Sequence, residues 1–120
     1  MYLTIIVLSG LVLIFAFLTI VKDPTDPALI EERKCRLEGK TFDEQQYEYY
    51  CDKCDGHVDE NSKHCRRCQR CTLGFDHHCI WLNNCIGYNN YRYFVVTIWL
   101  FTLQLILQGI FEGFLFFTVL

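Results

Sequence analysis

Cysteine and histidine side chains dominate the middle of this 120-residue chain. All of them except Cys35 lie between residues 51 and 85, and most follow the pattern C-x2-C-x9-H-x6-C, which occurs twice with an offset of 14 residues. The first copy comprises Cys51, Cys54, His64 and Cys71, and the second comprises Cys65, Cys68, His78 and Cys85. Three thiolates and one imidazole complete the tetrahedral shell of a structural zinc ion and leave no position for a metal-activated water. We therefore expect two structural Zn²⁺ ions that stabilise the fold.

Disulfide bonds are the alternative, because an even number of cysteines in a short chain also fits a disulfide framework. Tight C-x2-C pairs with interspersed histidines are more typical of metal ligands in a reducing compartment, which favours zinc. His57 is a rival ligand, since it lies 14 residues before Cys71, whereas Cys35 lies far from the cluster and is interpreted as a bystander. The cluster has few large apolar residues, so metal binding should supply much of its folding free energy, and chelation should unfold it.

Three residues inside the cluster are not used by the zinc pattern: Asp76, His77 and Cys79. A thiolate is a nucleophile, an imidazole can remove its proton, and a carboxylate can orient the imidazolium that forms, as in acyl-transfer enzymes. Adjacent side chains diverge, so His78 can face zinc while His77 faces Cys79. The alternative is that Asp76 and His77 only support the zinc ligands and that Cys79 is a spare thiol.

The 14-residue register that relates Cys51 to Cys65 falls next on Cys79. The other residues that a third ligand set would use are not zinc ligands in this setting: Leu82, Arg92 and Trp99. The pattern therefore predicts two metal sites and one unclaimed thiol.

Two apolar segments flank the cysteine-rich region and must position it. Residues 1–21 contain no charged side chain, and residues 93–120 contain one, Glu112. About 20 apolar residues in a helix span the roughly 30 Å hydrocarbon core of a bilayer, so both segments are predicted to be transmembrane helices. Between them we expect a linker at 22–50, with a short interfacial helix at 28–37, and a zinc-binding domain at 51–92.

Basic residues lie only between the two apolar segments, including Lys22 and Arg92 at their inner ends. The positive-inside rule therefore predicts an integral, multi-pass membrane protein whose central loop, linker included, is cytosolic. The chain has 11 Lys and Arg against 14 Asp and Glu, so its charge balance argues against nucleic acid as a partner. The expected fold class is an α-helical membrane protein in which two transmembrane helices are joined by a small irregular double-zinc cysteine-rich domain.

The second apolar segment carries polar side chains at every fourth residue: Gln104, Gln108 and Glu112. This spacing places them on one helix face, where lipid is a poor neighbour. Gly109 and Gly113 on the adjoining strip would let another helix approach closely. We expect these faces to contact other transmembrane helices, in addition to membrane lipid.

From Cys51 to Phe94 the sequence closely resembles the cysteine-rich domain of DHHC-type protein S-acyltransferases, the palmitoyltransferases. The matching residues are Asp76-His77-His78-Cys79, Trp81, Asn83-Asn84, Cys85, Gly87 and Asn90-Tyr91. The resemblance implies that Asp76, His77 and Cys79 are catalytic and that the two quartets hold zinc. It also implies that Cys79 takes a fatty acyl group from acyl-CoA, such as palmitoyl-CoA, as a thioester and passes it to cysteines of membrane-associated proteins. We therefore expect an enzyme, a protein-cysteine S-palmitoyltransferase.

The sequence also departs from the resembled pattern. Ile80 stands where those enzymes usually have proline after the cysteine, and restores a backbone N–H that proline lacks. The resembled enzymes usually have four or more transmembrane helices, of which this chain offers counterparts of two. The alternative function is therefore a structural or regulatory DHHC-like zinc subunit of a larger membrane protein complex, with reduced or no catalytic activity.

Overall fold

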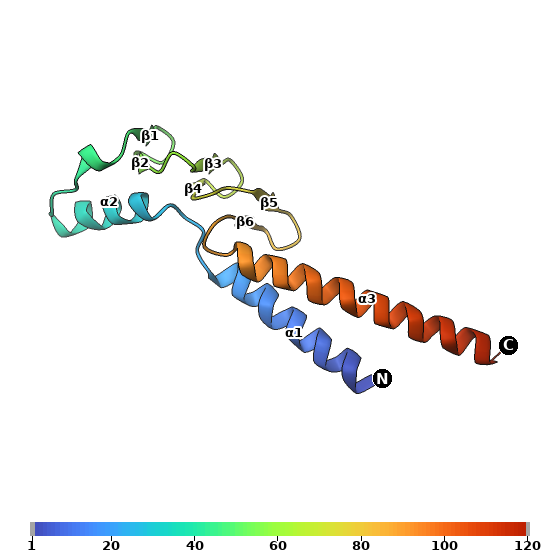
Figure 1. Cartoon of the computed structure of the whole chain (residues 1–120). Helices are drawn as coiled ribbons and strands as arrows, with labels where there is room; N and C mark the ends of the chain where they lie inside the picture. The colour runs from blue at the N-terminus through green and yellow to red at the C-terminus, as the bar shows by residue number, and fades with distance from the viewer. Residues whose placement is uncertain (1, 120) are drawn as a thin grey trace. The chain divides into compact units, whose positions relative to one another are not determined.

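The computed structural model describes residues 2–119, and its elements are labelled in Figure 1. The chain divides into two compact units, one formed by its two terminal helical segments and the other by Lys22–Tyr91. Each unit is described separately below.

The terminal unit consists of two helices, α1 (Tyr2–Val21) and α3 (Tyr91–Val119). Both are long and apolar enough to cross a membrane, and only 6% of the most apolar stretch of each is buried. A helix in the core of a soluble protein would instead be mostly buried. At 1.5 Å per residue, the 20 residues of α1 span about 30 Å, which matches the hydrocarbon thickness of a bilayer.

Two contacts between α1 and α3 fix their direction. Gln104 Nε2 donates a hydrogen bond of 2.9 Å to Ser9 Oγ, and the rings of Tyr2 and Phe111 meet edge to face with centroids 5.4 Å apart. The two contacts are seven residues apart on each helix and run in opposite order, so the helices are antiparallel. Gln104, one of the three polar residues predicted to face other transmembrane helices, therefore contacts α1 of the same chain.

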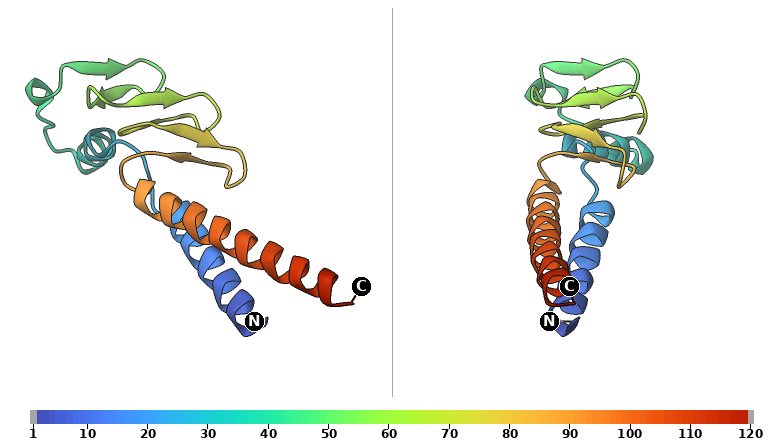
Figure 2. Two further views of the ribbon diagram at one scale, coloured as in Figure 1. Left: turned by 45° about the vertical axis from the view of Figure 1, so that its right-hand side comes forward. Right: turned by 90° about the vertical axis from the view of Figure 1, so that its right-hand side faces the viewer.

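Three β-hairpins form most of the second unit, where the sequence leads us to expect an irregular domain. They are β1 (Tyr49–Cys51) with β2 (Gly56–Val58), β3 (Lys63–Cys65) with β4 (Arg70–Thr72), and β5 (His77–Cys79) with β6 (Asn84–Ile86). Each hairpin begins 14 residues after the one before it, and Figure 2 shows them following one another in chain order. Their three-residue strands are too short to show an alternating apolar pattern, which explains why the sequence concealed them.

The hairpin turns repeat as closely as the strands do. Asp55, Gln69 and Asn83 each have a positive φ, of 51°, 52° and 46°, and they are again 14 residues apart. This left-handed conformation costs a non-glycine residue about 1 kcal/mol or more, although asparagine and aspartate tolerate it better. The common turn geometry gives Cys51, Cys65 and Cys79 the same position, at the end of the first strand of each hairpin.

Backbone hydrogen bonds join the second hairpin to its neighbours. Asp26 N donates to Cys71 O at 3.0 Å, and Tyr88 N donates to Leu73 O at 2.9 Å. The backbone approaches so closely at Gly87 that an added Cβ would lie 2.6 Å from the backbone oxygen of Leu73 and would also clash with Thr72 Cγ2. Glycine is therefore required at position 87, where the chain passes the second hairpin directly after β6.

The helix α2 (Pro27–Glu38) confirms the short helix expected at 28–37, and a 3₁₀ turn, η1 (Glu44–Gln46), follows it. Asp26 caps α2 by accepting from Ala28 N at 2.8 Å, and Pro27 occupies the first turn, where its missing N–H costs nothing. The buried side chain of Leu29 packs into a small core with Cys54, Val58 and Cys71, against which Cys51 also packs. Part of the segment predicted as a linker therefore covers the first hairpin.

Candidate functional site

The first predicted ligand quartet comes together between the first two hairpins. Its four ligand atoms lie within 4.8 Å of one another. His64 Nδ1 lies 3.8 Å from Cys51 Sγ, 3.2 Å from Cys54 Sγ and 3.9 Å from Cys71 Sγ. The end of β1 and its turn supply two cysteines, while β3 and β4 supply the histidine and the third cysteine.

The second quartet repeats this arrangement between the second and third hairpins. His78 Nδ1 lies 3.7 Å from Cys65 Sγ, 3.3 Å from Cys68 Sγ and 3.9 Å from Cys85 Sγ, and all four atoms again lie within 4.8 Å. The middle hairpin therefore contributes ligand atoms to both clusters.

Both clusters fit tetrahedral zinc. With Zn–S near 2.3 Å and Zn–N near 2.0–2.1 Å, neighbouring ligand atoms in a tetrahedron lie about 3.5–3.8 Å apart, close to the separations in both quartets. His64 also has a buried Nε2 with no hydrogen-bond partner among the described residues, so its Nδ1 is the ring nitrogen directed at the sulfurs. The donor set of three thiols and one imidazole suits Zn²⁺, while hard cations such as Mg²⁺ prefer oxygen.

The titration of the thiols reflects the same geometry. Burial raises the pKa of Cys51, but backbone N–H groups of Cys54 and Lys53 and the neighbouring thiols outweigh it and hold the pKa below its ordinary value. Burial raises the pKa of Cys85 to about 12, with a further contribution from the adjacent sulfurs of Cys68 and Cys65. Three thiolates crowded into one buried cluster therefore require a compensating cation, which a divalent metal supplies.

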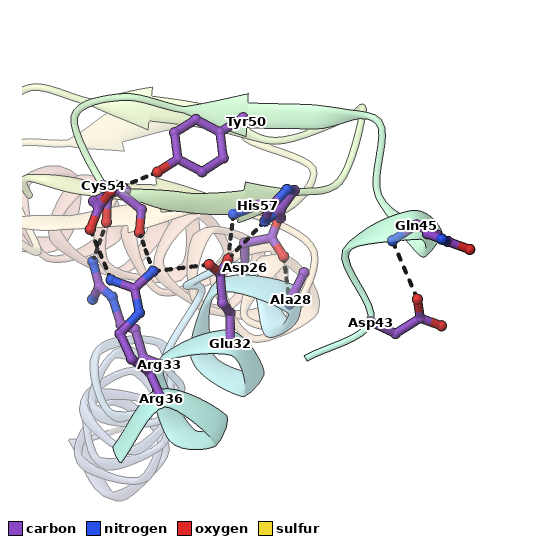
Figure 3. A network of polar contacts seen from close by, with 11 residues as sticks. Asp26, Ala28, Glu32, Arg33, Arg36, Asp43, Gln45, Tyr50, Cys54 and His57 are labelled. Atoms are coloured by element: carbon purple, nitrogen blue, oxygen red, sulfur yellow. Dashed lines mark hydrogen bonds and ion pairs between the residues drawn. The ribbon is translucent and has the colours of Figure 1, made fainter. Parts of the chain in front are cut away.

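His57, the rival ligand, lies outside both quartets and instead contacts α2, as Figure 3 shows. Its backbone N–H donates to Glu32 Oε2 at 2.6 Å, and its Nδ1 lies 3.1 Å from the same oxygen. Arg36 Nη2 donates to the other Glu32 oxygen at 3.0 Å. Burial raises the pKa of Glu32, but these hydrogen bonds outweigh it and hold the pKa below its ordinary value.

The candidate catalytic residues lie in the third hairpin: His77 and Cys79 on β5, and Asp76 directly before it. Asp76 Oδ2 is 2.9 Å from His77 Nδ1, and the Asp76 backbone N–H donates to Ile86 O across the hairpin at 2.9 Å. His77 and Cys79 are two residues apart on the strand and share one face, while His78 points to the other face and into the second cluster. Asp76 and His77 are partly exposed, and Cys79 is buried.

Four basic residues lie close to the ligands in sequence, and one of them, Arg70, is partly buried and bonded to other side chains of the unit. Arg70 Nη1 donates to Asp23 Oδ1 at 3.0 Å, and Arg70 Nη2 contacts Asn84 Oδ1. Lys63, Arg66 and Arg67 are exposed.

Sequence reasoning missed the structural roles of Asp26 and Glu32. Asp26 Oδ2 accepts from Asp59 N at 2.8 Å and contacts Ser62 Oγ, so this fully buried carboxylate ties α2 to the loop after β2. An aspartate followed by proline is a helix N-cap signature, and that signal could have located it. No comparable local signal marks Glu32.

Comparisons with known proteins agree with this geometry. The family model described as DHHC palmitoyltransferase matches residues 44–119. The "Probable protein S-acyltransferase 15" of Arabidopsis thaliana is 50% identical over 48 residues, which are 40% of this chain and 19% of that protein. The "Palmitoyltransferase swf1" of Schizosaccharomyces pombe is 50% identical over 60 residues, 50% of this chain and 17% of that protein.

A longer match joins this chain to the "Palmitoyltransferase akr1" of Emericella nidulans, which is 40% identical over 97 residues, or 78% of this chain and 13% of that protein. The chain thus spans less than a fifth of the length of each of these relatives. The region matched by the family model, residues 44–119, contains both cysteine and histidine clusters described above. This chain belongs to the DHHC palmitoyltransferase family.

Proposed function

We propose that this chain is a protein S-acyltransferase in which Cys79 accepts a fatty acyl group from acyl-CoA and passes it to a cysteine of a membrane-associated protein. The observation that carries the proposal is the 2.9 Å contact between Asp76 Oδ2 and His77 Nδ1 at the start of the strand that also carries Cys79. Family membership and the names of the relatives, which describe acyl transfer, support the same activity.

In the first half-reaction, His77 removes the proton of the Cys79 thiol, and Asp76 stabilises the imidazolium that forms. The Cys79 sulfur attacks the acyl carbonyl carbon, a new C–S bond forms, and the bond to the coenzyme A sulfur breaks. His77 returns its proton to the departing thiolate. In the second half-reaction a substrate cysteine attacks the Cys79 thioester in the same way, and Cys79 recovers its proton.

The eight ligands of the two quartets would hold two structural zinc ions. Zinc there would supply rigidity and neutralise the thiolates, since each set is already four-coordinate. His78 and Cys85 lie opposite each other on β5 and β6, so the second set would fix the strand that carries His77 and Cys79.

We further propose that α1 and α3 cross the membrane with the hairpin unit on the cytosolic side, as Lys22 and Arg92 favour. Gln108 donates to Glu112 within α3 at 3.1 Å, and an added Cβ at Gly109 or Gly113 would meet nothing within 4 Å. This combination of a polar pair and open glycine positions suits another transmembrane helix at this face of α3. Thiol labelling with an impermeant reagent outside intact cells would contradict this topology if it reached the loop cysteines.

The deciding experiment incubates purified, zinc-loaded protein with labelled palmitoyl-CoA and then with neutral hydroxylamine, which cleaves thioesters. We expect a hydroxylamine-labile label that Cys79→Ser abolishes. Cys35→Ser is the matched control and should keep the label, because Cys35 lies on α2, outside both quartets. A folded, zinc-loaded protein that takes no label would overturn the proposal and favour a structural subunit of a membrane complex.

A further inference from the structure

Thr72 carries a buried hydroxyl whose role the ligand quartets do not explain. The residue ends β4 and is 0% exposed, and its Oγ1 makes no hydrogen bond of ordinary geometry to any residue that the structure describes. A buried hydroxyl without a partner is costly, so such groups are rare in folded proteins and need an explanation. The direction of the Thr72 side chain indicates which acceptor the hydroxyl serves.

The side chain of Thr72 faces the segment that begins with Cys85. Its Cγ2 lies so close to Gly87 that a Cβ added there would clash with it. Arg70 lies two residues earlier on the same strand, and therefore on the same face, and it contacts Asn84, directly before Cys85. Thr72 thus projects from the second hairpin towards β6, which carries the last ligand of the second quartet.

The Cys85 sulfur is within reach of the Thr72 hydroxyl. Burial has the largest effect on the Cys85 thiol and raises its pKa, as do the sulfurs of Cys68 and Cys65, whereas the Thr72 hydroxyl lowers it. A hydroxyl lowers the pKa of a thiol when it donates to the ionised sulfur. A neutral thiol is a weak acceptor and a thiolate is a stronger one, so the hydroxyl gains its partner when Cys85 ionises to bind a metal.

The first quartet has a different group at the equivalent position. Val58 ends β2 where Thr72, 14 residues later, ends β4. Val58 is also buried, and it packs in one core with Cys71, the ligand that corresponds to Cys85. Valine and threonine have nearly the same shape, and they differ in that a hydroxyl replaces a methyl group. Among the described residues, this position therefore has an O–H donor beside the second quartet and a methyl group beside the first.

We propose that Thr72 is a positioning residue of the second zinc site, and that its hydroxyl donates a hydrogen bond to the metal-bound thiolate of Cys85. The hydrogen bond fixes the sulfur and draws negative charge from it, which stabilises the metal complex and makes the sulfur a weaker nucleophile. Cys85 pairs with His78 in the β5–β6 ladder, so the same contact helps to fix the strand that carries Cys79. The inference rests on zinc in the second quartet and not on acyl transfer, so failure of Cys79 acylation would not affect it.

The test measures the zinc affinity of the whole chain by competition with a chromogenic chelator. Thr72→Val removes the O–H group and keeps the shape. We expect it to hold one of the two zinc ions about 10–100-fold more weakly, the usual cost of losing a hydrogen-bond partner of a metal ligand, and the other as tightly as the parent does. Thr72→Ser keeps the donor and should bind both ions nearly as the parent does. Thr25→Val is the matched control, because Thr25 is a buried threonine of the same unit whose hydroxyl donates to Asp23 and not to a sulfur.

Cobalt substitution adds a measurement that a purely structural role would not change. Tetrahedral Co²⁺ with thiolate ligands has a sulfur-to-metal charge-transfer band, and loss of a hydrogen bond to the sulfur shifts this band to lower energy. We expect the shift in Thr72→Val, and we expect none in Thr72→Ser or Thr25→Val. Unchanged d–d bands in the visible region would show that both sites of a variant are still tetrahedral.

The contrary result is equally distinct. If the Thr72 hydroxyl serves no metal ligand, Thr72→Val should resist denaturant better than the parent, because an unpartnered polar group has been removed from the interior. Its zinc affinities and its charge-transfer band would then match those of the parent, which would overturn the inference. Equal weakening of zinc binding in Thr25→Val would assign the effect to packing and overturn it too, as would a parent chain whose second quartet binds no zinc.

Discussion

The first and third hairpins share one register but complete it differently. In the first, Tyr50 and His57 occupy the positions that hold zinc-set residues in the other hairpins. Glu32 of α2 contacts His57, and the Tyr50 ring lies edge to face against the His57 ring. In the third, Cys79 is equivalent to the cluster cysteines Cys51 and Cys65. Leu82 occupies the position of the second cysteine, which is Cys54 or Cys68 in the other hairpins.

The first and the last hairpin of this metal-binding repeat thus differ in what contacts their outer positions. At the first hairpin, α2 contacts the strand position that holds a cluster cysteine in the other two hairpins. Glu32 accepts a hydrogen bond from the backbone N–H of His57, and the buried side chain of Leu29 packs nearby. At the third hairpin the cysteine position is kept and its metal partners are not. The proposed function uses this thiol, because Cys79 lies next to His78 of the second quartet but outside both ligand sets.

Removing one thiol from each cluster should give the largest difference between the two ends. Cys68→Ser removes a ligand of the cluster that holds β5 and β6, so we expect about one zinc per chain and loss of Cys79 acylation. Cys54→Ser should also remove one zinc but retain part of the acylation, because its cluster lies between the first two hairpins. Metal analysis and hydroxylamine-labile label check this, and equal activities would contradict it.

Supplying the missing cysteine should convert the third hairpin towards metal binding. Leu82→Cys creates a C-x2-C pair with Cys79 on the same turn geometry as the other two pairs. With a slight excess of zinc we expect acylation to fall about tenfold or more, since a metal-bound thiolate is a poor nucleophile, and a mild chelator should restore it. Trp81→Cys, with the wrong spacing, is the matched control. Unchanged zinc sensitivity in Leu82→Cys would show that the third turn does not mimic the others.

Breaking the contact that covers the first hairpin should cost less. Glu32→Gln weakens the hydrogen bonds to His57 and Arg36, and we expect a loss of about 1–3 kcal/mol in the free energy of unfolding. Because the folded pKa of Glu32 lies below its ordinary 4.5, its stabilisation is complete above that pH and is lost as pH falls through the folded pKa.

Denaturant unfolding of zinc-loaded parent and variant at several pH values measures this difference. The gap between Glu32→Gln and the parent should close below pH 4.5. Glu31→Gln is the control at the adjacent exposed carboxylate and should match the parent throughout. A gap that widens on acidification would contradict the assignment.

The smallest effect concerns the turns that give all three hairpins their common shape. Gln69→Gly should raise the free energy of unfolding by about 0.5–1 kcal/mol, because glycine adopts the φ of 52° without strain. Asn83→Gly should gain less, since asparagine already tolerates this conformation. Chemical denaturation in excess zinc resolves the two, and a loss of stability in Gln69→Gly would mean that its side chain contributes more than the strain costs.

Residue spacing located the site better than it located the fold. The two quartets followed from a repeat that ligand chemistry makes visible, and the structure brings together the same eight side chains. The family resemblance drawn over Cys51 to Phe94 is confirmed by the family match. Three-residue strands, in contrast, leave no periodic signal, so the hairpins were not foreseen.

Long-range polar contacts were also beyond local patterns. Arg70 meets Asn84 and Asp23, 14 and 47 residues away, and Glu32 meets His57 across 25 residues. Such pairings depend on how the hairpins stack, which residue type and spacing do not encode. The catalytic roles and the membrane topology therefore stay predictions that the experiments above address.

The sharing of the middle hairpin between both clusters has a consequence for how the chain is made. The first ligand set is complete once Cys71 has been synthesised, whereas the second must wait 14 residues more, for Cys85. At about 5–20 residues per second this is an interval of roughly 1–3 s. During that time the Cys65 and Cys68 thiols are present without His78 and Cys85, on a hairpin whose His64 and Cys71 could already hold a metal in the first quartet. Chain order therefore allows the first quartet to form before the second, which includes His78 on the strand that carries Cys79.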